Sequence, residues 1–267
     1  MSESALSFSI LTLNTRSIPL TKSRLRLRAI AEELESSNLS LVNFQEVHTF
    51  THLLLLRRHM SSFPYLSFSR ALYGPYSGLV TFSKIPIASH RFLRFSKLGA
   101  LYNKSIIARI VRNGILITEL AEQEVVILNT HLTPNTDSNW SSSNRFIPYI
   151  EKQILQLAEI TNNLIEDGKQ VIIAGDFNVP KDTRLYKLFL ERTGAIDLFS
   201  AFDFPTYHGE FLIDGQRPRR IDYVLLAGNK ASSASFTSSH LFTKKVKLGG
   251  IMVYPSDHIG LKTSVLL

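Results

Sequence analysis

Residues 171–178 read VIIAGDFN, a continuous apolar run that ends abruptly in polar residues. An apolar run without alternation is typical of a strand that is buried on both faces, as in the centre of an α/β sheet. Residues 142–166, just before this run, carry the longest helical pattern of the chain, and a second helix is predicted over residues 183–192. The order helix, buried strand, helix predicts an α/β fold.

Short strands and helices alternate in the same way toward both ends of the sequence. Strands are predicted over residues 8–14, 41–45, 221–226 and 259–266, and helices over residues 21–36 and 51–60. Residues 65–131 are predicted to be mostly strands, and residues 232–239 a loop or an edge strand. Because strands recur without a hinge-like break, we expect a single domain over residues 1–267.

Composition excludes several classes of protein. The 267-residue chain contains no cysteine, which rules out disulfide frameworks, cysteine nucleophiles, thiolate zinc sites and iron–sulfur clusters. No segment approaches the roughly 18 apolar residues of a membrane span, and the N-terminus MSESALSFSILTLN lacks the features of a signal peptide. We expect a monomeric, cytoplasmic protein without a transmembrane segment.

The net charge of +8 comes from one stretch of the sequence. Residues 47–118 contain ten basic and no acidic residues, and the rest of the chain carries 20 basic and 22 acidic residues. A local positive field favours an anionic partner such as a phosphodiester, a nucleic acid or an anionic membrane. The alternative is a solvated face that only keeps the protein soluble.

Polar residues close nearly every apolar strand. They are Asn14, Glu46, Asn129, His131, Asp176, Asn178, Asp222, Asp257 and His258. Each alone is commonly a cap or a turn former, but strand ends of an α/β sheet meet at one edge, where sites form. Carboxylate and amide oxygens in the absence of thiolates favour Mg²⁺ or Mn²⁺ over zinc.

Strand geometry adds two expectations about these residues. In an extended GDFN segment, Asp176 and Asn178 point to the same face because side chains alternate. Asp257 and His258 are adjacent, so they should face opposite ways and have different functions.

Seven motifs in a fixed order carry a resemblance to a known family. They are LNTR, QEV, SGLVTFSKIPI, NTHL, GDFN, RIDYVLL and SDHIGL. This set resembles the endonuclease/exonuclease/phosphatase (DNase I-like) superfamily of divalent-metal phosphoesterases. The resemblance implies a four-layered α/β/β/α sandwich, with two mixed sheets packed face to face and helices outside.

Within this superfamily the sequence is most similar to the neutral, Mg²⁺-dependent sphingomyelinases. SGLVTFSKIPI, the segment YNKSIIARI and the helix after NTHL carry this similarity. The lysine loop here reads NKS, where a glycine often follows the lysine. The long hydrophobic hairpin and signal peptide of the secreted bacterial enzymes are not visible in the sequence.

The resemblance implies a role for each polar position. Glu46 would be the principal ligand of Mg²⁺ or Mn²⁺, assisted by Asn14 and Asp257. His258, oriented by Asp222, or alternatively Asp176, would act on the attacking water, and His131 and Asn178 would bind phosphate oxygens. Additional substrate contacts are expected from Lys104, Arg219, Arg220 and Trp140. The alternatives are a solvated strand entry for the two arginines and half-buried packing, the more ordinary fate, for the tryptophan.

These observations favour a metal-dependent phosphodiesterase that hydrolyses its substrate by in-line attack of water. A sphingomyelinase-like lipid phosphodiester is the preferred substrate, with possible contact to an anionic membrane. A nuclease or DNA-repair phosphodiesterase is the main alternative, because the basic segment suits a polyanion. A non-catalytic binding module on the same fold is the third hypothesis.

Overall fold

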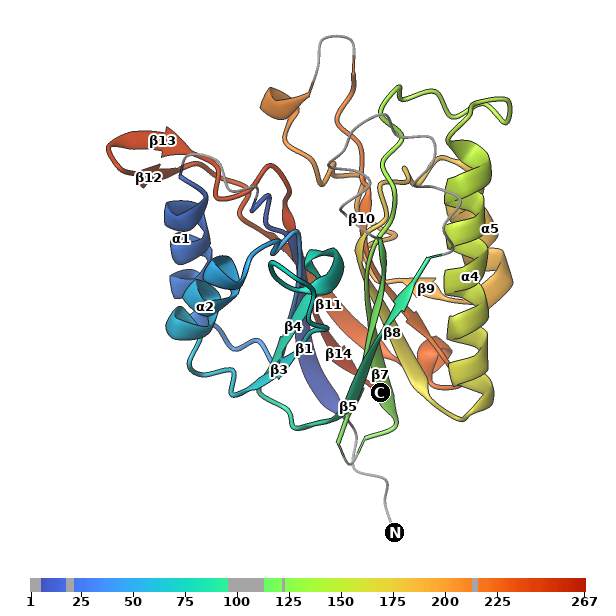
Figure 1. Ribbon diagram of the computed structural model, residues 1–267. Helices are drawn as coiled ribbons and strands as arrows, with labels where there is room; N and C mark the ends of the chain where they lie inside the picture. Colours follow the sequence, from blue (N-terminus) through green and yellow to red (C-terminus); the bar gives the residue numbers. More distant parts are fainter. Residues whose placement is uncertain (1–5, 18–21, 96–112, 122, 213–215) are drawn as a thin grey trace.

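Two six-stranded mixed sheets face each other in the computed structural model, and helices cover their outer faces (Figure 1). The structure describes residues 6–17, 22–95, 113–121, 123–212 and 216–267. The first sheet has the order β11 (Ser235–Leu241), β14 (Gly260–Leu266), β1 (Ser7–Asn14), β2 (Leu41–Gln45), β4 (Val80–Ser83) and β3 (Tyr65–Ser67). The second has the order β5 (Ile87–Arg94), β6 (Gly114–Leu120), β7 (Val125–His131), β8 (Gln170–Asp176), β10 (Asp222–Ala227) and β9 (Ile196–Asp197).

In the described part of the chain, each outer face carries a pair of helices. Helices α1 (Ser23–Glu35) and α2 (Phe50–His59) pack on the first sheet, and α4 (Ile147–Glu166) and α5 (Arg184–Thr193) pack on the second. A separate two-stranded hairpin, β12 (Val246–Leu248) and β13 (Ile251–Val253), lies beside α1 (Figure 1). The predicted four-layered sandwich is confirmed.

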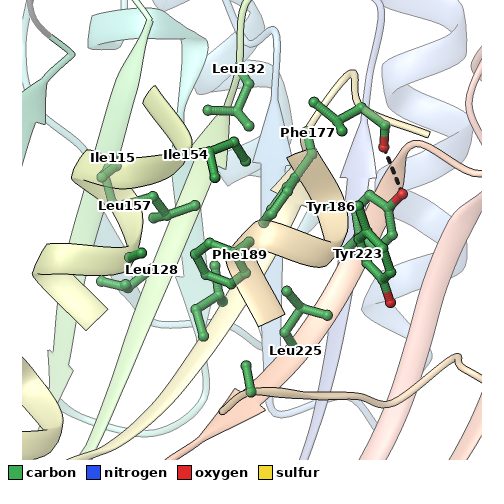
Figure 2. Packing of buried hydrophobic residues seen from close by; sticks show 14 of the residues in the cluster. Ile115, Leu128, Leu132, Ile154, Leu157, Phe177, Tyr186, Phe189, Tyr223 and Leu225 are labelled. Carbon is green, nitrogen blue, oxygen red and sulfur yellow. Dashed lines mark hydrogen bonds between the residues drawn. The ribbon is translucent and has the colours of Figure 1, made fainter. Parts of the chain in front are cut away.

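Three hydrophobic clusters separate the four layers. The cluster between the sheets joins Ile10 and Leu41 of the first sheet to Ile127, Ile172 and Val224 of the second. A second cluster lies under α1 and α2, and a third under α4 and α5. Figure 2 shows part of the third, where aromatic side chains stack between the helices and the sheet. Both faces of the central strands are therefore buried, which explains their unbroken apolar sequences.

Strand direction brings the polar strand ends to one edge of the sandwich. Strand β1 runs parallel to β2, and β7 runs parallel to β8. The hydrogen bond from Asn14, at the end of β1, to Asp176, at the end of β8, places the ends of both pairs at the same edge. Strands β14 and β10 run antiparallel to β1 and β8, and they therefore begin where those strands end. The residues that follow β1, β2, β7 and β8 therefore share one edge with the residues that precede β10 and β14.

The sequence-based element boundaries agree with the structure, with two differences. Helix α4 begins at Ile147 rather than at residue 142, because the side chain of Asn144 accepts the N–H of Phe146 at 2.8 Å and proline occupies the first helical turn. The hairpin β12–β13 was not predicted, since each of its strands has only three residues. Residues 235–241 form an edge strand, one of the two alternatives for that segment.

Every helix among the described residues is too short or too polar to span a membrane.

The aromatic core under α5 generates a stability prediction. Phe189 is fully buried, and its ring meets Phe177 edge to face at 5.8 Å between centroids. We expect Phe189→Ala to lower the free energy of unfolding by about 3–5 kcal/mol, because it leaves a cavity that the packed layers cannot close. Leu155→Ala, at a 38% exposed position of α4, should change it by less than about 0.5 kcal/mol. Urea denaturation of both variants measures the difference, and equal losses would contradict it.

Candidate active site

The carboxylate of Asp176, at the end of β8, is the centre of the polar edge. Its Oδ2 accepts the side-chain amide of Asn14 at 3.0 Å and lies 3.5 Å from Nε2 of His131 and 3.6 Å from Nε2 of His258. Its Oδ1 accepts the backbone N–H of Asn178 at 2.8 Å. Asp176 is almost completely buried. One carboxylate therefore contacts groups from both sheets.

Close packing explains the glycine that precedes this aspartate. Gly175 has φ of 148°, and a Cβ there would lie 2.0 Å from the carbonyl oxygen of Thr130 on β7. Only glycine allows β8 to approach β7 this closely at its end. The approach places Asp176 directly opposite His131 in the β7–β8 pairing.

His258 and Asp222 form a buried pair beside Asp176. Nδ1 of His258 lies 2.9 Å from Oδ2 of Asp222, and both side chains are buried. Burial by itself lowers the pKa of His258, but the carboxylates of Asp222 and Asp176 outweigh it and raise this pKa well above 6.5. Burial also raises the pKa of the Asp222 carboxyl. The imidazole is thus held in a fixed orientation with Nε2 toward Asp176.

Asn178 does not lie on an extended strand as predicted. Strand β8 ends at Asp176, and Asn178 has φ of 52°, a left-handed conformation that asparagine tolerates. The Asp176 side chain stabilises this turn by accepting the Asn178 backbone N–H. The Asn178 side chain donates to the carbonyl of Leu132 at 3.0 Å, next to His131. The residue still joins the site, but through a turn.

Glu46 lies at the more open side of the site in a strained conformation. Its φ is 64°, which is uncommon for a residue other than glycine. Gly78 supports it, because a Cβ at Gly78 would lie 2.8 Å from the Cα of Glu46, and the Gly78 carbonyl accepts the N–H of Val47 at 2.9 Å. The Glu46 side chain remains 21% exposed and lies 3.9 Å from Nε2 of His48. Strain of this kind is frequent at functional sites.

Asn14 connects Glu46 to Asp176. Its Nδ2 donates to Oε1 of Glu46 at 3.2 Å as well as to Asp176, and its Oδ1 accepts the N–H of Arg16 at 3.0 Å. In this orientation the amide nitrogen, rather than the oxygen, faces the two carboxylates.

Asp257 has different partners from His258, as their adjacency predicts. Nε of Arg16 lies 3.3 Å from Oδ2 of Asp257, and the Tyr207 hydroxyl donates to the same oxygen at 3.3 Å. Burial and the charge of Asp257 raise the pKa of Tyr207, so this hydroxyl remains a donor. The strand-end pattern does not predict Tyr207 or His48. Arg16 lies in the motif LNTR, but its contact with Asp257 was not predicted.

The four predicted substrate contacts have different outcomes. The prediction for Arg220 is wrong: this guanidinium is 4% exposed and forms a buried ion pair of 2.6 Å with Asp197. Arg219 pairs with Asp182 at 3.2 Å on the exterior. Trp140 is half-buried and packs against the cluster under α4 and α5. Lys104 lies outside the described residues.

Several described members of the basic segment lie on different elements. Arg57 and Arg58 occupy the last turn of α2, where positive charge suits the helix dipole. Arg91 pairs with Glu119 on the neighbouring strand, and Lys84 donates to the carbonyl of Ser37. These contacts are separate from the polar edge.

The donors at the edge suit a hard cation. Four carboxylates gather there, from Glu46, Asp176, Asp222 and Asp257, and carboxylate oxygens are the ligands that Mg²⁺ and Mn²⁺ prefer. In the described part of the chain, one group of acidic and histidine side chains has ligand atoms within 4.8 Å of one another, and it consists of Asp176, Asp222 and His258. Arg16 beside Asp257 and His258 beside Asp222 offset part of this negative charge, and a divalent cation would offset more of it.

The polar edge and the sandwich together define a class of proteins. The family model described as "Endonuclease/Exonuclease/phosphatase family" matches residues 11–258. The chain belongs to this family. A search of curated protein sequences finds no match.

Solved structures share the fold over nearly the whole chain. Truncated TDP2 from Caenorhabditis elegans is 17% identical, with a TM-score of 0.71 and 98% of each chain covered. A mutant of Staphylococcus aureus beta toxin with bound magnesium ions is 18% identical, with a TM-score of 0.75 and 97% and 99% covered. Sphingomyelinase C from Streptomyces griseocarneus is 18% identical, with a TM-score of 0.70 and 97% and 99% covered. At these identities the likeness shows the fold.

The His258–Asp222 pair generates a prediction that does not depend on the substrate. We expect Asp222→Asn to lower the pKa of His258, because the largest interaction that opposes the burial of the imidazolium is removed. NMR titration of the imidazole in metal-free protein measures this pKa. Asp182→Asn, which removes a carboxylate on the exterior, should leave it unchanged. An unaltered His258 pKa in Asp222→Asn would show that the carboxylate does not control the imidazole.

Proposed function

We propose that the protein is a Mg²⁺-dependent phosphodiesterase, with Mn²⁺ as an alternative ion, and that residues 1–267 act as a single catalytic domain. The observation that carries the proposal is the gathering of Asn14, His131, His258 and Asn178 around Asp176, in a group of four carboxylates. A bound divalent cation would neutralise charge that develops on the phosphate and the leaving oxygen.

Each residue of the site then has a role that its contacts support. Glu46, with Asn14 and Asp257 assisting, would hold the cation, since the Glu46 side chain is more exposed than the other three carboxylates. Asn14 would ligate through Oδ1 after rotation of its amide, whose nitrogen faces the carboxylates in this structure. His131 and Asn178 would donate to phosphate oxygens, an interaction that strengthens as negative charge builds up. Either His258, held by Asp222, or Asp176 would take the proton of the attacking water.

Hydrolysis of a soluble chromogenic phosphodiester with Mg²⁺, with and without chelator, tests this function. We expect Glu46→Gln to raise the Mg²⁺ concentration needed for half-maximal rate, because a charged oxygen ligand is lost. His258→Ala should mainly lower kcat, by about 10²–10⁴-fold. Asp182→Asn is the matched control, a carboxylate removed outside the site. Absence of metal-dependent turnover by the wild-type protein would favour the non-catalytic binding module.

For the substrate, we favour a lipid phosphodiester presented at an anionic membrane surface. Ile251 and Met252, at the tip side of the β12–β13 hairpin, are 45% and 58% exposed, and the exposed Lys247 lies on the partner strand. Apolar side chains flanked by lysine suit insertion at a lipid interface. Tyr254, which follows β13, stacks on the ring of His208. The backbone N–H of His208 donates to the backbone carbonyl of Asp257 at 2.8 Å. The hairpin is therefore connected to the site.

The name of one structural neighbour, sphingomyelinase C, agrees with this preference. The basic segment of residues 47–118 supports the alternative, a nuclease or DNA-repair phosphodiesterase. Sphingomyelin vesicles that contain an anionic lipid, assayed beside plasmid and abasic DNA, separate the two. Turnover of DNA alone would overturn the lipid preference.

The hairpin generates its own prediction. We expect the double variant Ile251→Ser/Met252→Ser to lose about 10- to 100-fold in turnover of vesicles, because the variant lacks two apolar side chains that would be buried in the lipid. Turnover of the soluble chromogenic substrate should be unchanged. Leu54→Ser, which alters a 61% exposed leucine on α2, is the control. Equal effects on vesicles and soluble substrate would show that the hairpin does not contact lipid.

A further inference from the structure

Two amides are buried between the sheets, directly below the candidate site. Gln45 and Asn129 have no exposed surface. Gln45 belongs to the motif QEV and Asn129 to the motif NTHL. The surrounding cluster between the sheets consists of apolar side chains such as Ile10 and Ile172. A buried amide must be hydrogen-bonded to be tolerated there. The partners of these two amides therefore reveal what they do.

The hydrogen bonds of these amides cross from one sheet to the other. Gln45 on β2 donates through Nε2 to Oδ1 of Asn129 on β7 at 2.8 Å, and also to Oγ1 of Thr12 on β1 at 3.0 Å. Asn129 in turn donates through Nδ2 to the carbonyls of Phe44 at 3.1 Å and Val80 at 3.0 Å. The Asn129 side chain of the second sheet is thus fixed to two strands of the first, β2 and β4, and Gln45 extends the network to β1.

The two sheets each supply half of the site. Glu46 follows Gln45 directly, at the end of β2, while His131 lies two residues after Asn129 on β7. Because side chains alternate along a strand, Asn129 and His131 lie on the same face of β7. Apolar contacts between sheets are not directional, whereas hydrogen bonds are. The amide pair is a directional contact between the sheets, next to Glu46 in sequence and two residues from His131.

We propose that Gln45 and Asn129 are positioning residues that fix the register of one sheet on the other, and thereby set Glu46 relative to His131 and Asp176. The inference rests on the proposed function for its effect on rate. Its effect on geometry can be tested without any substrate.

The test compares two variants that each remove buried polar contacts from the first sheet. Gln45→Met keeps the length of the side chain and removes both of its donors. Thr81→Val is the matched control, because the Thr81 hydroxyl donates at 2.7 Å to Asn43, also on β2, within the same sheet. Thr12→Val removes only the second anchor of Gln45 and serves as a milder variant if Gln45→Met does not fold.

We expect Gln45→Met to lower kcat by about 10- to 100-fold with little change in KM, since displacement of reacting groups by about 1 Å has effects of this size. Calorimetric titration with Mg²⁺ should show weaker binding, and the imidazole NMR resonances of His131 should shift. Thr12→Val should show smaller changes in the same direction. Thr81→Val should lower the melting temperature but leave kcat, Mg²⁺ affinity and the His131 resonances unchanged.

Two results would overturn the inference. One is a Gln45→Met protein, or a Thr12→Val protein if the former does not fold, with wild-type kcat, Mg²⁺ affinity and His131 resonances. The other is a Thr81→Val protein with losses equal to those of the Gln45 variant. A wild-type protein without turnover would instead refute the proposed phosphodiesterase, and the His131 resonances would still decide the positioning role.

Discussion

The carboxylate of Asp176 lies where the two sheets meet, and the geometry of the site depends on it. Asn14 of β1 and His258 before β14 reach it from the first sheet, while His131 on β7 reaches it from the second. A buried carboxylate is stable only when its oxygens are satisfied. The sheets must therefore close in one relative position, because any other would leave this charge without its partners. The relative position of the sheets that packs the sandwich is therefore also the one that assembles the site.

Local backbone rules are broken close to this carboxylate, and the scaffold compensates. Glu46 and Asn178 both adopt positive φ, and Gly175 and Gly78 allow main chains to approach closely beside them. Positive φ at a non-glycine residue costs roughly 1–3 kcal/mol. Such departures concentrate where function overrides local preference. The surrounding strands and the buried clusters between the layers supply the stability that this strain removes.

The strand pattern predicts an α/β fold with one polar edge, whereas the four-layered sandwich and the roles of the site residues come from the family resemblance. Unbroken apolar strands mark buried sheets, and polar residues at their ends mark one edge. Tyr207 and the burial of Arg220 could not be predicted in this way. Arg220 pairs with Asp197, 23 residues away, and nothing in the pattern of either segment indicates the contact. The turn at Asn178 was not predicted, because the hydrogen bond from the Asn178 backbone N–H to the Asp176 side chain favours a turn over the extended conformation.

The distribution of charge separates chemistry from substrate selection. The chain carries a net charge of +8, yet its polar edge gathers four carboxylates, with Arg16 as the guanidinium that contacts Asp257. A phosphodiester therefore meets a local negative field unless a divalent cation is bound there. Attraction by the basic segment acts at longer range and is weakened by salt. In the proposed function, cation binding at the edge would control reaction with phosphate, and the exposed hairpin would contribute to the choice of phosphodiester.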